Sequence, residues 1–210
     1  MDHFFTHDQQ FKEWLKYYHI IDNTEMDSVS IYHRLHQFLL VDALHPREVI
    51  LDAVNQFKQS VQWDNYTVFG MHIRTGLLEG NIGWGRFLEE EDIQYFISEA
   101  LRITTQRQKI DTSKPVKWLV LVDSKAVKRK VSKALGDQVI VSNCTVHHSK
   151  YLDSHAMFCS FVENYLLSDC KFLMLTFKST YGYLARYRTD VNQINVLPGT
   201  WRRKQNKEQM

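Results

Sequence analysis

Apolar positions follow a helical spacing in the first sixty residues of the chain. Across residues 9–19 they recur every three or four positions, which predicts an amphipathic helix. The same spacing predicts a second helix over residues 27–39 and a third that begins at Pro46. We therefore expect a helical N-terminal region over residues 1–60.

From Tyr66 onward, short apolar runs alternate with helical patterns. The apolar runs predict strands at residues 66–74, 118–122, 138–142, 171–175 and 195–197. Helical spacing predicts helices at residues 89–106, 127–135, 154–167 and from residue 180 onward. Strands that alternate with helices are typical of a parallel sheet flanked by helices. The sequence thus predicts an α/β fold over residues 61–200, followed by a polar tail at residues 201–210.

Composition limits the classes of partner. An apolar share of 44% in 210 residues supplies enough core for one large or two small domains. Lys and Arg total 26 against 24 for Asp and Glu, a formal net charge of +2, which argues against nucleic-acid binding. No apolar stretch approaches the roughly 20 residues that span a bilayer. We expect no nucleic-acid partner and no transmembrane segment in this chain.

The cysteines and histidines do not predict a metal site. Cys144, Cys159 and Cys170 lack metal-binding spacing, and an odd number cannot form a closed set of disulfides, so we expect buried thiols. His33 and His36 lie beside an apolar helical stripe without a third ligand. They are interpreted as ordinary, partly buried histidines.

The segment from Phe172 to Ala185 carries the first candidate chemistry. Its apolar run breaks into small polar residues and then resumes with helical spacing, which predicts a strand, a tight turn and a helix start. The free N–H groups and the dipole of a helix N-terminus favour a phosphate. The turn, Lys178, Ser179 and Thr180, lacks the glycines of a P-loop. We predict an anion site of another type.

A second strand end supplies a cation. The run from residue 66 ends in His72, Arg74 and Gly76, and a guanidinium can bind a phosphate through two hydrogen bonds. Ligands of open parallel sheets bind beyond the carboxyl ends of the strands. The polar residues at these ends are His72, Arg74, Asp123, Ser124, Thr176, Lys178 and Ser179. We expect them to converge on one phosphate-bearing ligand.

Three motifs resemble those of the fucosyltransferase superfamily, with its nodulation-type, core-type, protein O-type and plant xyloglucan-type enzymes. Gly70-Met-His-Ile-Arg-Thr-Gly76 resembles its His-x-Arg motif, and Leu121-Val-Asp-Ser124 resembles its strand that ends in Thr-Asp-Ser. The segment from Glu163 to Ala185 resembles its closing motif, most closely the plant form. The resemblance covers residues 40–190 and implies a Rossmann-like nucleotide-sugar-binding domain, the C-terminal donor half of a two-Rossmann-domain glycosyltransferase.

By this resemblance, Arg74 would be the catalytic residue. It would bind the β-phosphate of GDP-fucose and stabilise the charge that grows on the leaving group, without a metal. Ser179 and Thr180 would share that phosphate, with Lys178 as a further cation. The resemblance implies no cofactor beyond GDP-fucose as the donor substrate.

The remaining donor contacts would hold the nucleoside. Glu163 would accept hydrogen bonds from guanine N1–H and N2–H, and His72 would help to hold the same base. Asp123 and Ser124 would lie near the nucleoside. The predicted donor-binding set is His72, Arg74, Asp123, Ser124, Glu163, Thr176, Lys178, Ser179 and Thr180.

Two departures from the family pattern keep two functions open. Thr75 stands where many relatives have a second arginine, and too few residues precede Tyr66 for the family's acceptor domain. One hypothesis is inverting transfer of fucose to a glycan or protein hydroxyl, with a glycan or glycoprotein as acceptor. The alternative is a non-catalytic nucleotide-sugar-binding or interaction module. The compartment would be the Golgi or secretory lumen for part of a longer eukaryotic enzyme, and the cytoplasm otherwise.

Overall fold

The chain divides into two units of contacts. The computed structural model describes residues 9–17, 19, 34–35, 45–76, 88–142, 154–177, 179–189 and 191–196. The units are Met1–Arg47 and Glu48–Met210. In the first unit, helix α1 spans Gln9–Tyr17, which confirms the predicted first helix. Most of the helix predicted over residues 27–39 lies outside the described residues.

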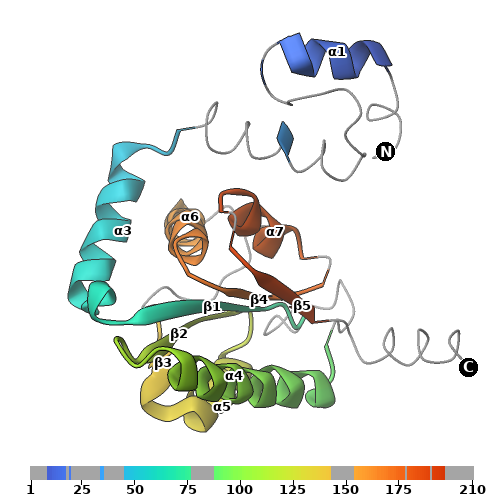
Figure 1. The fold of residues 1–210 in the computed structure, drawn as a ribbon. Helices are drawn as coiled ribbons and strands as arrows, with labels where there is room; N and C mark the ends of the chain where they lie inside the picture. The colour runs from blue at the N-terminus through green and yellow to red at the C-terminus, as the bar shows by residue number, and fades with distance from the viewer. Residues whose placement is uncertain are drawn as a thin grey trace, which may run out of the picture. The chain divides into compact units, whose positions relative to one another are not determined.

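The second unit is built on a five-stranded sheet in which every neighbouring pair is parallel (Figure 1). Its strands are β1 (Thr67–Ile73), β2 (Val116–Val122), β3 (Val139–Ile140), β4 (Leu173–Thr176) and β5 (Gln193–Val196). Their order is β3-β2-β1-β4-β5, so the chain moves outward from β1 to β3 and then returns to the other side of β1. This is the strand order of a Rossmann-like sheet, and it confirms the predicted α/β class.

Helices cover both faces of this sheet (Figure 1). One face carries α3 (Glu48–Ser60), α6 (Ser154–Ser168) and α7 (Thr180–Tyr187), and the other carries α4 (Glu90–Ile110) and α5 (Lys125–Leu135). Two short 3-10 helices, η2 (Trp63–Asn65) and η3 (Gly136–Gln138), precede β1 and β3. None of the described helices is long and apolar enough to cross a membrane.

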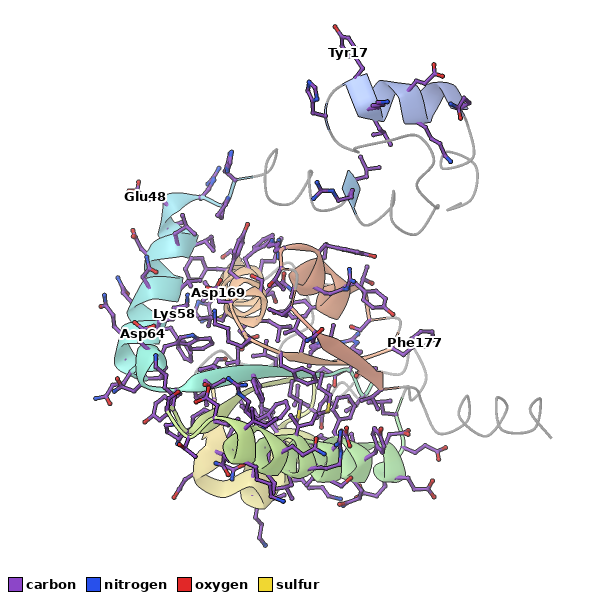
Figure 2. All side chains as sticks on the ribbon, in the orientation of Figure 1. Tyr17, Glu48, Lys58, Asp64, Asp169 and Phe177 are labelled. Atoms are coloured by element: carbon purple, nitrogen blue, oxygen red, sulfur yellow. The ribbon has the colours of Figure 1, made fainter. Side chains whose placement is uncertain are left out.

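Helix α3, which falls within the predicted N-terminal region of residues 1–60, packs with the sheet. Its Ile50 and Val54 are buried in the same core as Val162 of α6. Lys58 of α3 also forms an ion pair with Asp169, just after α6 (Figure 2). The contacts of α3 thus belong to the second unit.

Alternate side chains of each strand enter two separate cores. In β2, Trp118 and Val120 pack with the α4 and α5 side, whereas Leu119 and Leu121 pack with the α3 and α6 side. Successive residues of a strand point to opposite faces, so a strand covered on both sides must be apolar throughout. This explains why the strands appear in the sequence as continuous apolar runs.

Gly70 in β1 allows a close approach of α6 to the sheet. A Cβ atom at this position would lie 2.5 Å from Leu167 Cδ1 and 2.9 Å from Leu173 Cδ2. Real Cβ contacts are longer, so another residue would force these side chains to shift. The absence of a side chain at Gly70 therefore lets Leu167 and Leu173 pack directly against the backbone of β1.

The expectation of buried thiols is correct for one cysteine and wrong for another. Cys170 is free and buried, whereas Cys159 of α6 is disulfide-bonded. An odd number of cysteines excludes a closed set but still permits one pair and one thiol. Cys144, the remaining cysteine of the chain, lies outside the described residues.

Candidate functional site

The order of the strands reverses between the parallel neighbours β1 and β4. Strands β2 and β3 follow on one side of β1, and β4 and β5 lie on its other side. In open parallel sheets, this reversal leaves a crevice at the carboxyl ends of the strands, where ligands bind. Arg74 follows β1 at this edge, and Thr176 ends β4. Ser179 then forms the N-cap of α7. The structure thus brings together these three of the predicted site residues.

Thr176 connects the ends of the two strands. It is fully buried, and its Oγ1 accepts a hydrogen bond from the Arg74 backbone N–H at 2.9 Å. The same hydroxyl donates to the carbonyl oxygen of His72 at 3.2 Å. These bonds extend the contact between β1 and β4 by one residue beyond their ladder, which ends at His72 and Leu175. Thr176 therefore determines where Arg74 leaves the sheet.

Asp123 holds the turn that follows β1. Its Oδ1 accepts from the Thr75 backbone N–H at 2.8 Å and from the Thr75 hydroxyl at 2.6 Å. Its Oδ2 accepts from the Gly76 N–H at 3.0 Å and pairs with Arg74 Nη1 at 3.1 Å. Gly76 has a φ of 73°, a conformation that glycine adopts without strain. The carboxylate thus faces the β1 turn, and its predicted place near the nucleoside stays a prediction.

His72 lies beneath the first turn of α7. Its ring centroid is 4.9 Å from that of Tyr181, at an interplanar angle of 32°. Its Nδ1 is buried and has no hydrogen-bond partner among the residues that the structure describes; it lies close to Gly182, where a Cβ atom would be only 3.3 Å away. Burial lowers the pKa of His72 to about 4, with Arg74 lowering it further and Asp123 opposing. His72 is therefore uncharged near neutral pH, and its contact with a base stays a prediction.

The start of α7 presents polar groups to the same edge. Ser179 is buried, its side chain makes no capping hydrogen bond, and Thr180 is exposed. The first N–H groups of a helix have no partner within the helix and favour an anion. Lys178 lies outside the described residues.

Glu163 lies in a separate polar cluster near the end of β3. The Ser142 hydroxyl, just after β3, donates to Glu163 Oε1, and Lys128 Nζ of α5 donates to the Ser142 carbonyl at 3.0 Å. Burial raises the pKa of Glu163, and the Ser142 hydrogen bond and the charge of Lys128 oppose this shift. Burial also lowers the pKa of Lys128. Ser142 and Lys128 were not predicted as site residues, because no local pattern in the sequence indicates that α5, β3 and α6 meet there.

Ser124 has a structural contact of its own. It is buried as the N-cap of α5, where its side chain accepts a hydrogen bond from the Val127 N–H at 3.5 Å. Such a contact stabilises a helix start. A contact between Ser124 and a nucleoside stays a prediction. Among the residues that the structure describes, no three His, Cys, Asp or Glu side chains gather as they would around a metal ion.

The chain was compared with protein families, curated proteins and solved structures. No family model matches it, and no curated protein sequence matches it. A NodZ α-1,6-fucosyltransferase soaked with GDP-fucose is 17% identical with a TM-score of 0.48, over 68% of this chain and 42% of that one. A Se-Met fucosyltransferase NodZ from Bradyrhizobium is 16% identical with a TM-score of 0.48, over 73% and 46%. The chain spans less than half of the length of these structures.

Proposed function

We propose that this chain binds GDP-fucose at the carboxyl ends of β1 and β4 and contributes the donor site for fucose transfer. The observation that carries the proposal is the position of Arg74 at the reversal point of the sheet. Its side chain is 27% exposed and therefore reachable from solvent. A guanidinium beside a helix start is suited to a diphosphate.

Arg74 would act on the leaving group. As the bond between fucose C1 and the β-phosphate oxygen breaks, negative charge grows on GDP. A preorganised guanidinium stabilises that charge more than it stabilises the intact donor, which lowers the barrier. The first turn of α7, with Ser179 and Thr180, would share the charge through N–H and hydroxyl donors. The acceptor hydroxyl would attack C1 from the opposite side, which gives inversion.

Glu163 would select the base. An ionised carboxylate accepts two hydrogen bonds from the N1–H and N2–H of guanine, and uracil has no matching pair of donors. Burial, the largest effect on the pKa of Glu163, favours the neutral form, whereas the Ser142 hydrogen bond and the nearby charge of Lys128 favour the ionised form. A base without both donors would leave part of this half-buried carboxylate unpaired, which weakens binding.

The motifs at Arg74, Asp123 and Glu163 support a place for the chain in the fucosyltransferase superfamily, as the nucleotide-binding half of a two-domain enzyme. In such an enzyme the acceptor, a glycan or protein hydroxyl, would bind mainly to the other half. The catalytic base, if one is needed, would then come from the acceptor side. Transfer by this mechanism requires no metal ion.

One observation favours a second function, a binding module without turnover. Asp123 is the carboxylate that forms an ion pair with Arg74. Its oxygens also accept three hydrogen bonds from Thr75 and Gly76. These contacts hold the turn after β1, so both oxygens of Asp123 are already engaged within the protein. A donor-binding module would retain Arg74 and Glu163 without supplying a base.

Calorimetric titration tests the binding. GDP, GDP-fucose and UDP are titrated into the wild-type chain, Arg74→Ala and the control Arg102→Ala, with EDTA present. Arg102 is a surface arginine of α4 that pairs with Glu99. We expect GDP and GDP-fucose to bind, UDP not to bind, and Arg74→Ala to weaken GDP by about tenfold to a hundredfold.

Two results would contradict the proposal: equal affinity for UDP and GDP, or an unchanged GDP affinity in Arg74→Ala. Release of fucose or GDP from bound GDP-fucose, followed over time, separates the two functions. Guanine-selective binding without any release, with or without glycan acceptors, supports the binding module.

A further inference from the structure

We infer that Asp123 is a positioning residue that sets the Arg74 guanidinium in place before a phosphate arrives; this inference rests on the proposed function. Asp123 follows β2 directly, and Arg74 follows β1. The two strands are paired up to Ile73 and Val122. Asp123 and Arg74 therefore leave the sheet side by side, and the carboxylate can reach across to the neighbouring turn.

The carboxylate uses both of its oxygens. Oδ1 accepts two hydrogen bonds from Thr75, and Oδ2 accepts the Gly76 N–H and contacts Arg74 Nη1. A carboxylate offers about four lone-pair sites; three accept hydrogen bonds here, and the Arg74 guanidinium lies beside Oδ2 as an ion pair. An asparagine would keep one oxygen but would turn an NH2 group toward N–H donors. Both acceptor oxygens of Asp123, and not only its shape, are therefore needed here.

The ion pair leaves most of the Arg74 guanidinium available. Arg74 Nη1 contacts Asp123 at 3.1 Å, and no other side-chain partner of Arg74 is found among the residues that the structure describes. A guanidinium has five N–H donors in a rigid plane, so the others remain for a ligand. An arginine that is already ordered loses less conformational freedom when it binds a phosphate. Asp123 would therefore strengthen anion binding through Arg74.

Thr75 takes part in the same arrangement. It is buried, and its hydroxyl is directed to Asp123 rather than to a ligand. Thr75→Val removes this hydroxyl but leaves the contacts of Asp123 Oδ2 with Gly76 and Arg74 intact. This variant therefore disturbs the turn without releasing the guanidinium, which makes it the matched control for Asp123→Asn.

The charge of Asp123 also has an opposite effect, because a nearby carboxylate repels an incoming phosphate. The Asp123 side chain is only 9% exposed, accepts three hydrogen bonds and pairs with Arg74, and these contacts offset much of its charge. Ordering of Arg74 then outweighs repulsion, and removal of the charge should weaken anion binding. Tighter binding of GDP by Asp123→Asn would overturn the inference, because Asp123 would then act as a competitor for Arg74.

A double-mutant cycle separates positioning from a general structural role. GDP and guanosine are titrated calorimetrically into the wild type, Asp123→Asn, Arg74→Ala and the double variant, with Thr75→Val as control. We expect Asp123→Asn to weaken GDP by about threefold to tenfold and to leave guanosine unchanged. In the Arg74→Ala background, the same substitution should change GDP affinity by less than about twofold. Equal losses in both backgrounds would overturn the inference.

A ligand-free measurement keeps this inference distinct from the proposed function. Nitrogen-15 relaxation of the Arg74 side-chain Nε reports how ordered the guanidinium is. We expect an ordered Arg74 in the wild type and in Thr75→Val, and a mobile Arg74 in Asp123→Asn. Equal mobility in all three overturns the positioning role. Absence of GDP binding by the wild type, with Arg74 ordered by Asp123, contradicts the proposed function alone.

Discussion

His72 is a histidine that this fold keeps uncharged. Its ring is buried against Tyr181, and within the described part of the chain its Nδ1 has no hydrogen-bond partner. Burial is the main reason that its pKa falls from 6.5 to about 4, with a smaller lowering from Arg74 and an opposing effect from Asp123. A charged imidazolium is therefore more costly in the folded protein than in the unfolded chain.

This shift predicts a pH dependence of stability. The folded pKa is lower than the unfolded pKa, so the contribution is complete above pH 6.5 and is lost as pH falls toward 4. We expect His72 to account for a loss of about 2 to 3 kcal/mol in the free energy of unfolding over this range. Urea unfolding at several pH values measures it in the wild type and in His72→Phe.

The phenylalanine variant retains the ring stacking but does not titrate. It should lose this part of the pH dependence, whereas the control His45→Gln, at an exposed histidine, should retain it. Equal slopes in the wild type and His72→Phe would show that His72 is not the source.

At the scale of elements, α7 depends on its contacts with α6. It has eight residues, too few for a helix that is stable in isolation. Asn164 of α6 donates to the Tyr181 carbonyl oxygen at 2.8 Å and accepts from Arg188, which follows α7. The Tyr181 hydroxyl also donates to the Ser160 carbonyl oxygen at 2.9 Å. The predicted phosphate site therefore rests on a helix that α6 holds in place.

Asn164→Ala tests this dependence. Asn164 is buried, so its loss leaves the Tyr181 carbonyl and Arg188 without their partner. We expect a loss of about 1 to 3 kcal/mol in the free energy of unfolding. Hydrogen exchange should become faster in residues 180–187 while α4 keeps its protection. The exposed Asn65→Ala is the control, and unchanged exchange in α7 would contradict the prediction.

At the scale of the whole molecule, the two cysteines that the structure describes differ in state, and Cys170 is expected to be a protected thiol. The chain has three cysteines, of which Cys159 is disulfide-bonded and Cys170 is free and buried. Burial raises the pKa of Cys170 well above 9.0, with Asp169 adding to the shift and Lys58 opposing it. Both burial and the low thiolate fraction protect Cys170 from reagents.

Titration with a thiol reagent checks this prediction. We expect Cys170 not to react in the native protein and to react after unfolding without a reductant. Cys170→Ser should remove one reactive thiol from the unfolded chain. Labelling of Cys159 in the unfolded protein, identified by mass spectrometry of the peptides, would show that Cys159 is not paired.

The apolar pattern alone predicted most of the second unit, because each signal is local. Strand β2 and helix α6 match their expected ranges closely, and helix α3 begins two residues after its expected start at Pro46. A strand covered on both faces needs an unbroken apolar run, and an amphipathic helix needs a 3.6-residue repeat. Alternation of these elements was sufficient to predict parallel strands. Parallel strands in turn place Arg74 and Thr176 at one edge of the sheet.

Contacts between distant segments could not be predicted in this way. Arg74 and Thr176 are 102 residues apart and Thr75 and Asp123 are 48 apart, yet hydrogen bonds join each pair. The clustering of Ser142 with Glu163 and the pairing of Cys159 likewise depend on which elements become neighbours. The hydrophobic pattern of one segment does not indicate which distant segment will contact it.

By itself, therefore, the sequence determined the kinds of element, their succession and the polar residues that end the strands, because hydrophobic periodicity and helix-start chemistry act within a few residues. Only the tertiary structure decided the strand order and, with it, the reversal point between β1 and β4. It also decided that the Asp123 carboxylate faces Arg74 and that His72 lies beneath α7. The physical reason is that burial and hydrogen bonding between distant segments depend on the packing of the whole sheet and its helices.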